Sequence, residues 1–390
     1  MQHARSKLMP AFAFRHIKDL YPIFWNKALG MLDCIANETK AEKLNEKADS
    51  SIMFDAQLWA GRVTLDTIGS AGFAVDFGSL KDPGNPLADA YRITSTQGGM
   101  TFLMNFLSQT TLTRTMASLF STSAKNMYSA RATILKTCQD VLTEKRAKLA
   151  KGDHGDVDIL AVALRSGSFD DQELIDYILN FLVAGHDTTA IAITWALYCL
   201  CKYPKVQTKL REEITAKLPS PRSNNAGAPA SVSAADIDDC AYLHAVCHET
   251  LRLHSPVQAS MRTSPVDTIV AGHVIPANTS LILNPPLFNR SEALWGPDAS
   301  VFKPERWLAP GQANKGGAQS NYAFSTFGHG PRACIAQGMA KAEMACLLAP
   351  LVGRYVMEMA EPEWKPVVNK GIGTRPVNTL WLRMRENEAW

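Results

Sequence analysis

The sequence has little excess charge and no long run of apolar residues. Its 40 Lys and Arg residues face 37 Asp and Glu residues, so the net charge of +3 produces no field strong enough to predict a nucleic-acid partner. The longest apolar stretch, Ala190–Cys201, is too short to cross a bilayer. We interpret it as part of a buried core helix, and we expect no membrane anchor in the chain as given.

Two further patterns are missing. Eight cysteines occur, but none forms the Cys-x-x-Cys pair of a structural zinc site, and no signal peptide precedes them. Mostly free thiols in a reducing compartment are therefore expected. A complete dinucleotide-binding fingerprint is absent too, because the pair Gly371 and Gly373 lacks a third glycine and follows no predicted strand. The chain is not expected to bind NADPH itself.

The composition is that of an ordinary globular protein. Hydrophobic residues make up 46% and charged residues 20% of 390 residues, which fits one large domain or two smaller ones. Apolar residues recur at helical spacing in Phe54–Ile68 and Ala130–Leu149. Helix is therefore predicted to dominate the first half of the chain.

A longer helix is expected over about residues 172–201. Its start can be capped in either of two ways, by Ser168 with Asp171 or by Asp170 with Glu173. The sequence alone leaves both caps open.

Short β-prone runs lie between two loops. The runs 268–270, 273–275 and 280–283 are broken by a glycine and by a Pro-Ala-Asn turn, and they predict a small sheet. Residues 218–235 and 309–319 are rich in small and polar residues and are predicted to be loops. The expected fold class is mainly α with a small β part.

One cysteine is distinguished by its surroundings. Cys334 follows a glycine-rich turn that contains Arg332, and it precedes the helical run 336–351. Backbone N–H groups at the helix start would hydrogen-bond an anionic sulfur, and Arg332 would add positive charge, so we expect a lowered pKa for Cys334. A lone cysteine is more often a small buried hydrophobe. The Gly-Pro-Arg surroundings favour a thiolate site instead.

The pattern Phe327-Gly-x-Gly-x-Arg332-x-Cys334 resembles the haem-binding loop of the cytochromes P-450, and it is highly specific. The resemblance implies that Cys334 binds the iron of haem b as an axial thiolate, which favours O–O cleavage. It also implies that Arg332 pairs with a propionate and that Phe327 packs against the ligand side of the macrocycle. The family usually has glycine two residues after the cysteine, and we expect Ala336 to be tolerated there.

A second motif lies inside the long predicted helix. The segment from Ala184 to Thr189 reads Ala-Gly-His-Asp-Thr-Thr and resembles the oxygen-binding segment of the same family. Small side chains at Ala184 and Gly185 would let a flat cofactor approach the backbone, and a threonine hydroxyl can bond a carbonyl one turn back. An isolated Asp-Thr-Thr would more often be a polar interruption of a core helix. The resemblance implies that Asp187 and Thr188 deliver protons during oxygen activation.

Other positions match the family at separate places in the chain. Glu249 and Arg252 lie on one helix surface, an arrangement that by itself is common on protein surfaces. They resemble the Glu-x-x-Arg motif, and Arg306 lies where the family supplies a second arginine. A buried network that fixes the cysteine loop is therefore expected. Arg262 and, more weakly, Arg5 resemble arginines that bind haem propionates.

The resemblance extends over essentially all 390 residues and implies one haem-thiolate domain, residues 1–390, with a helix-rich fold and a small β-sheet subdomain. Met1 falls inside about the third helix of the family, so we expect a domain that is incomplete at its N-terminus. The missing part would include the membrane anchor of eukaryotic members. Association with the endoplasmic reticulum membrane, on its cytoplasmic face, is expected only if that anchor exists, and the chain as given would be cytoplasmic.

The implied activity is a monooxygenase that inserts one atom of O2 into a small lipophilic substrate. Electrons would come from NADPH through a partner reductase that docks on the thiolate side of the haem. Residues 65–73 and 374–378 resemble fungal microsomal members, which suggests secondary metabolism. Phe181, Val257 and Val368 are predicted to lie near a partly apolar pocket.

Two other functions stay open at this point. A truncated haem-binding protein without turnover fits the same motifs, because a missing N-terminal part would leave the pocket open. A thiolate-haem isomerase or dehydratase that uses no external O2 is the least favoured, because such family members tend to lack the acid–alcohol pair that Asp187 and Thr188 form.

Overall fold

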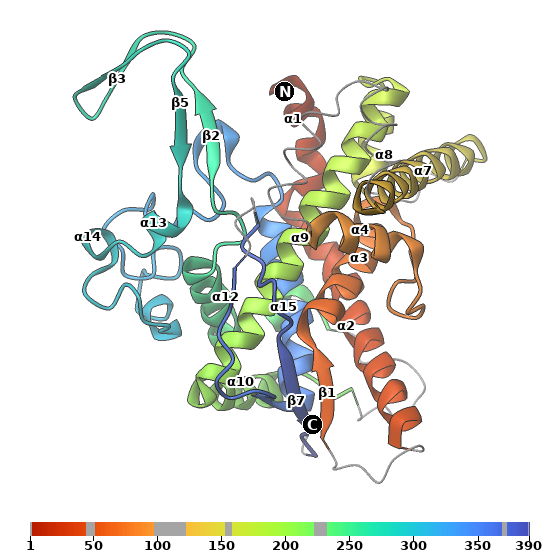
Figure 1. Ribbon diagram of the computed structural model, residues 1–390, viewed down its shortest axis with the longest axis vertical. Helices are drawn as coiled ribbons and strands as arrows, with labels where there is room; N and C mark the ends of the chain where they lie inside the picture. The colour runs from red at the N-terminus through yellow and green to blue at the C-terminus, as the bar shows by residue number, and fades with distance from the viewer. Residues whose placement is uncertain are drawn as a thin grey trace.

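Helices dominate the molecule, as the hydrophobic periodicity predicts (Figure 1). The computed structural model describes residues 2–43, 51–96, 122–152, 158–221, 232–368, 373–388 and 390. The α-helices within these ranges are α1 (Gln2–Leu8), α2 (Phe14–Lys43), α3 (Ala56–Phe73), α4 (Pro86–Thr96), α7 (Thr122–Ala150), α8 (Ile159–Arg165), α9 (Asp171–Lys202), α10 (Pro204–Lys217), α11 (Ala234–Asp238), α12 (Ala241–Leu253), α13 (Pro285–Asn289), α14 (Glu292–Trp295) and α15 (Gln337–Arg354). Short 3-10 helices are η1 (Met9–Phe12), η2 (Pro304–Trp307) and η3 (Gly330–Arg332).

The strands within the described ranges form three separate antiparallel sheets. They are β1 (Ile52–Asp55), β2 (Ser260–Thr263), β3 (Thr268–Val270), β4 (His273–Ile275), β5 (Ser280–Leu283), β6 (Tyr355–Met359) and β7 (Trp381–Glu386). One sheet has the order β1-β7-β6, and the other two ladders are β2-β5 and β3-β4. This arrangement confirms a mainly α fold with a minor β part.

Helix α9 runs through the middle of the molecule, with α3 and α15 packed against it (Figure 1). Its start is a capping box in which the Asp170 side chain accepts from the Glu173 N–H at 2.8 Å and Glu173 accepts from the Asp170 N–H at 3.1 Å. The second of the two predicted caps is therefore confirmed. From Thr189 to Cys201 every residue of α9 is buried, as predicted for a core helix.

The predicted helix over Phe54–Ile68 begins two residues late. Phe54 lies in strand β1, and Asp55 caps α3 by accepting from the N–H groups of Gln57 and Leu58. Phe54 pairs with Leu382 in β7 at the other end of the chain. Local periodicity could not reveal this strand, because the partner that stabilises it is distant in sequence.

The three predicted β-runs form strands, but not one sheet. Strands β3 and β4 pair with each other, whereas β5 pairs with β2, and together they make an arm that projects from the helical body (Figure 1). The predicted loop 309–319 contains no helix or strand. Residues 222–231 of the other predicted loop lie outside the described residues, and that loop ends at Ser233, the N-cap residue of α11.

No described helix combines the length and the apolar character that crossing a bilayer requires. This finding agrees with the interpretation of Ala190–Cys201 as part of a core helix.

Candidate functional site

A cavity of about 820 Å³ lies between α9, the glycine-rich loop before α15 and the start of α15 itself. Most of its wall is apolar, with Phe12 and Ile68 among the side chains that line it. Several of the residues that the sequence singles out meet here: Ala184, Gly185, Thr188, Arg262, Phe327, Arg332 and Cys334. The described lining residues do not include Arg5 or Asp187.

The loop that ends at Cys334 is closed by its own backbone. The Cys334 N–H donates to the Phe327 carbonyl at 2.8 Å, so the intervening residues form a tight turn. Gly328 and Gly330 adopt φ values of 66° and 70°, a region that residues with a Cβ rarely enter. These constraints leave the Cys334 side chain exposed to the cavity just before α15.

The thiol of Cys334 faces the cavity but is surrounded by protein on its other sides. Desolvation by these walls raises the pKa of Cys334, whereas a hydrogen bond from the Ala336 N–H and the positive charge of Arg5 act in the opposite direction. The expected lowering of this pKa is therefore wrong in its net direction, because desolvation outweighs both favourable effects. The nearby cation that affects the thiol is Arg5, not the Arg332 that the sequence suggested.

Arg5 reaches the cysteine loop from the N-terminal helix α1. Its Nη1 donates to the carbonyl oxygen of Ala333 at 2.7 Å. A charged hydrogen bond of this kind ties the start of the described chain to the residue that precedes Cys334. Arg5, whose sequence match to the family is weak, thus contacts the backbone of the loop that carries Cys334.

Helix α9 contributes Ala184, Gly185 and Thr188 to the cavity wall. The Thr188 hydroxyl donates to the Ala184 carbonyl at 2.7 Å, as predicted for a bond one turn back. A Cβ added at Gly185 would lie 2.8 Å from Ile68 Cδ1. Gly185 therefore allows α3 to pack closely against α9, and its predicted role toward a cofactor stays a prediction.

Asp187 lies on the flank of α9, away from the described cavity lining. Its carboxylate forms an ion pair with the Arg375 guanidinium, and the two side chains are 26% and 19% exposed. The neighbouring His186 is buried against Tyr91, with ring centroids 4.9 Å apart. Burial lowers the pKa of His186 to about 4, so this imidazole is neutral at pH 7.

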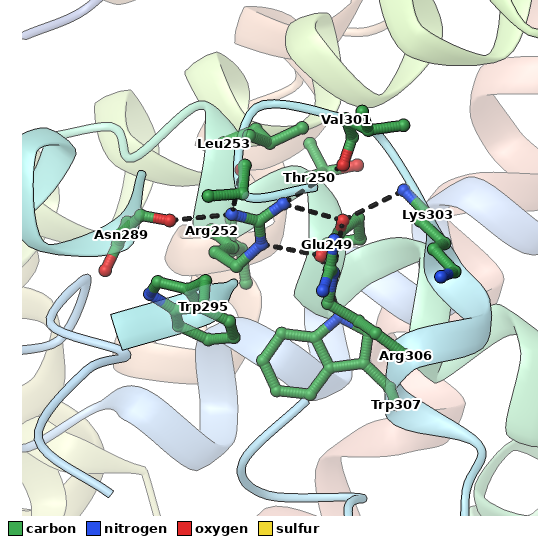
Figure 2. Close-up of polar contacts among 12 residues, drawn as sticks. Glu249, Thr250, Arg252, Leu253, Asn289, Trp295, Val301, Lys303, Arg306 and Trp307 are labelled. Atoms are coloured by element: carbon green, nitrogen blue, oxygen red, sulfur yellow. Dashed lines mark hydrogen bonds and ion pairs between the residues drawn. The ribbon is translucent and has the colours of Figure 1, made fainter. Parts of the chain in front are cut away.

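The Glu249 carboxylate is the centre of a buried polar network (Figure 2). Arg252 donates to both of its oxygens at 2.8 Å, and Arg306 Nε donates to Oε1 at 2.9 Å. The Lys303 N–H and the Trp307 indole N–H donate at 2.9 and 3.0 Å. The predicted network of one carboxylate with two arginines is confirmed.

The network extends to the loop that carries the thiol. Arg252 Nη1 donates to the carbonyls of Asn289 and Ala299 at 2.7 and 2.6 Å (Figure 2). The Asn289 amide donates to the Thr326 hydroxyl at 2.8 Å and accepts from the Ser325 N–H at 2.8 Å. The start of the cysteine loop is thus held by side chains from α12 and α13.

Glu343 is a cavity residue that the sequence reasoning missed. It lies in α15, is 2% exposed, and accepts a hydrogen bond from the Thr189 hydroxyl at 3.4 Å. Burial raises its pKa well above the ordinary value. The sequence did contain a sign of this residue, because Glu343 is an acidic residue inside the otherwise largely apolar helical run 336–351. Glutamate is rarely fully buried unless its carboxyl group has a partner.

A family model described as cytochrome P-450 matches residues 2–383. The chain belongs to the cytochrome P-450 family. It is 42% identical over 389 residues to the cytochrome P-450 monooxygenase sphH of Aspergillus fumigatus, a match that covers 99% of this chain and 70% of the relative. It is also 35% identical over 400 residues to the monooxygenase buaD of Petromyces alliaceus, with 99% and 72% covered, and 34% identical over 424 residues to FUM15 of Gibberella moniliformis, with 98% and 71% covered.

Family membership identifies the chain as a haem-dependent monooxygenase, an oxidoreductase that uses O2. The residues at the cavity fit a haem. Cys334 presents one soft sulfur ligand to a largely apolar space, and that space would hold the apolar macrocycle whose iron the sulfur would bind. Arg262 and Arg332 line the same space and carry the charge that two propionates require.

We predict that Glu249→Ala lowers the free energy of unfolding by about 3–5 kcal/mol, because Arg252 would be left as a fully buried charge without its carboxylate partner. Urea unfolding followed by circular dichroism measures this. Glu358→Ala is the control, since Glu358 is 47% exposed and pairs with surface arginines on β7. Equal unfolding curves for the two variants would contradict a structural role for Glu249.

We predict that the cofactor-free protein alkylates slowly at Cys334 near pH 7. The raised pKa leaves little thiolate at that pH, so the rate with iodoacetamide should rise about tenfold per pH unit until the pH passes the pKa. Arg5→Gln should move this profile to higher pH, because it removes a charge that favours the thiolate. A Cys34→Ala background removes the other cysteine that is not buried, and an unchanged profile in Arg5→Gln would contradict the placement of Arg5.

Proposed function

We propose that the chain inserts one oxygen atom of O2 into a small lipophilic substrate held in this cavity, while the other atom leaves as water. The observation that carries the proposal is that Cys334 and Thr188 face one largely apolar cavity from different elements. Phe181 and Val257, two of the predicted pocket residues, also line it, whereas Val368 is not among its described lining residues. Apolar walls favour a lipophilic ligand.

In this proposal Cys334 binds the haem iron through its sulfur, and Phe327 packs beside it. Arg262 and Arg332 bind the propionates from the cavity wall. Arg5 is assigned to the same set by family resemblance, and its bond to the loop backbone supports a position next to the cofactor. Haem, when bound, supplies the oxygen-activating chemistry.

Proton delivery is assigned to Thr188 and Asp187. The Thr188 hydroxyl lies at the cavity wall and donates its hydrogen to the Ala184 carbonyl. The hydroxyl oxygen can therefore still accept a hydrogen bond from a donor in the cavity. Asp187 supplies a carboxylate one residue away, on the flank of the same helix. Ala184 leaves room at the wall because its side chain is a single methyl group.

Electrons are proposed to come from NADPH through a partner reductase. The sequence lacks a complete dinucleotide fingerprint, which supports a separate carrier. The reductase is assigned to the Cys334 side of the haem. The fungal origin of the similar monooxygenases supports a substrate from secondary metabolism, and family resemblance supports a place on the cytoplasmic face of the endoplasmic reticulum membrane.

The direct test uses purified haem-loaded protein with an NADPH-dependent reductase. NADPH-dependent oxygenation within a panel of apolar probes, with a carbon monoxide difference spectrum typical of thiolate ligation, is the expected result. Cys334→Ala should abolish that spectrum, whereas Cys34→Ala should retain it. Haem binding that yields only peroxide would support the inert haem-binding protein instead.

We predict that Thr188→Ala lowers product formation on the order of 100-fold, because it removes the hydroxyl from the cavity wall. Thr194→Ala is the matched control in the same helix. Thr194 donates to the Ala190 carbonyl at 2.8 Å but does not line the cavity. Full activity in Thr188→Ala would favour the isomerase or dehydratase reading, in which no external O2 is used.

A further inference from the structure

Lys341 of α15 is a partly buried cation that lies between two aromatic rings. Its Nζ is 5.6 Å from the centroid of the Phe324 ring and 5.5 Å from the centroid of the Phe327 ring. An ammonium at such a distance is attracted by the negative face of a ring. Within the described ranges, no carboxylate is among the groups that act on the pKa of Lys341, so the two rings are its partners.

Phe324 is the firmly held ring of the two. It is buried, and it packs edge-on against Trp307 with ring centroids 5.4 Å apart. The Trp307 indole N–H in turn donates to Glu249 at 3.0 Å. His248 packs against both rings, at 5.0 Å from Trp307 and 6.2 Å from Phe324. Phe324 is therefore attached to the buried network around Glu249.

Phe327 is enclosed less completely. Its ring is partly buried and meets Phe324 edge-on, with centroids 6.2 Å apart. Gly328 follows directly and has no side chain that could pack on the ring. The Phe327 carbonyl accepts from the Cys334 N–H at 2.8 Å, so this residue is joined to the thiol through the backbone. The position of its ring depends on the contacts that Phe324 and Lys341 supply.

Lys341 contacts the Phe327 ring without lining the cavity. Ala340 and Glu343 are lining residues, whereas Lys341 is not among those described. Successive residues of a helix point about 100° apart, so Lys341 faces the thiol loop and α12 instead. Arg5, not Lys341, is the cation that acts on the pKa of Cys334. Lys341 therefore reaches the sulfur through the ring and not through its own field.

The titratable groups that face Lys341 from α12 keep one charge state near neutral pH. Burial lowers the pKa of His244, and it lowers that of His248 further, so both rings are neutral at pH 7. Burial raises the pKa of Cys247 to about 12. Burial also lowers the pKa of Lys341 to about 8. Within this set, Lys341 is the group that changes its charge between about pH 7 and pH 10.

The acids nearest to this set are engaged elsewhere. Asp238 of α11, which acts on His244, is paired with a lysine of α2 at 2.7 Å. Glu213 of α10 also acts on His244, and it accepts from two backbone N–H groups of α12 at 3.0 and 2.9 Å. In the thiol loop, the His329 ring contacts the Phe324 carbonyl at 3.1 Å. None of the three acts on the pKa of Lys341.

We propose that Lys341 is a positioning residue that holds the Phe327 ring over the thiol loop, and that it thereby keeps solvent water from the sulfur of Cys334 on the side that does not face the cavity. The inference rests on the proposed function, since it takes Cys334 as the iron ligand. The ammonium joins the Phe327 ring to the Phe324 ring, which the Glu249 network holds. Without the positive charge this link is lost, and the Phe327 ring is free to move away from the loop.

The test follows thiolate ligation over time in purified haem-loaded protein, reduced under carbon monoxide. We expect Lys341→Met to lose the difference spectrum typical of thiolate ligation about fivefold faster than wild type at pH 7. The physical reason is that water reaches the sulfur, which takes a proton from it and separates from the iron. Lys341→Arg should keep the wild-type rate, because a guanidinium also binds ring faces.

Lys202→Met is the matched control. Lys202 lies 5.5 Å from the centroid of the Tyr198 ring at the C-terminal end of α9, so the same charge and a similar ring contact are removed away from the thiol loop. Its spectrum should decay at the wild-type rate. An equal acceleration in Lys202→Met and Lys341→Met would overturn the inference.

The pH dependence gives a second measurement. A neutral amine has no cation–π attraction, so the decay in wild type should accelerate about fivefold as the pH rises through the pKa of Lys341, from about 7 to about 9.5. Lys341→Arg stays charged over this range and should show a flat profile. The same rise in both proteins would overturn the assignment to Lys341.

A double-variant cycle tests whether Lys341 acts through the ring. In a Phe327→Leu background, Lys341→Met should cause no further acceleration, because the ring on which the ammonium acts is gone. An equal acceleration in both backgrounds would overturn the inference. So would a lower melting temperature of Lys341→Met together with an unchanged decay of the spectrum, since that result would leave Lys341 with a general structural role.

The two levels fail differently. Wild-type protein that binds haem but gives no thiolate spectrum would overturn the proposed ligand and this inference with it. A wild-type thiolate spectrum that decays at the same rate in Lys341→Met would overturn the inference alone.

Discussion

The burial of one carboxylate organises this molecule. Glu249 and Arg252 are both fully removed from water. The desolvation free energy of such a pair exceeds its Coulomb attraction unless every carboxylate oxygen and every guanidinium N–H is hydrogen-bonded. The required donors come from α12, η2 and the segment before η2, so these parts must assemble together. Through Asn289, the same network holds the backbone N–H of Ser325 and the hydroxyl of Thr326, from which the thiol loop continues.

Two walls of different construction then face each other across the cavity. The α9 wall is part of the core, where Gly185 admits Ile68 from α3 and leaves little freedom to move. The thiol wall is a glycine turn closed by the hydrogen bond from Cys334 to Phe327 and steadied by Arg5. Cys334 and Thr188 therefore line the cavity from two walls that are each held by contacts with other parts of the chain.

The site also separates two carboxyl groups by environment. Glu343 is buried in α15, where desolvation raises its pKa well above the ordinary value, and it accepts a hydrogen bond from the Thr189 hydroxyl. Asp187 is partly exposed and paired with Arg375. Placing one acid in an apolar setting and another beside a cation is a common way for one fold to give two carboxyl groups different behaviour.

Much of the site follows from local sequence. The glycine turn, Cys334 and the Asp170–Glu173 cap are encoded within a few residues, because hydrogen bonds between near neighbours decide them. Glu249 with Arg252 was also predictable, since three residues of helix bring them together. The net pKa direction at Cys334 was not, because desolvation depends on everything that surrounds the sulfur.

Contacts between distant parts of the chain required the tertiary structure. Strand β1 exists because Phe54 meets Leu382, and no local pattern contains that partner. Asp187 was visible in the sequence, whereas Arg375 as its partner was not, because the two are 188 residues apart and converge only after the C-terminal segment packs beside α9. The sequence by itself determined which chemistry the chain carries, and the packing of remote segments decided where each charge stands.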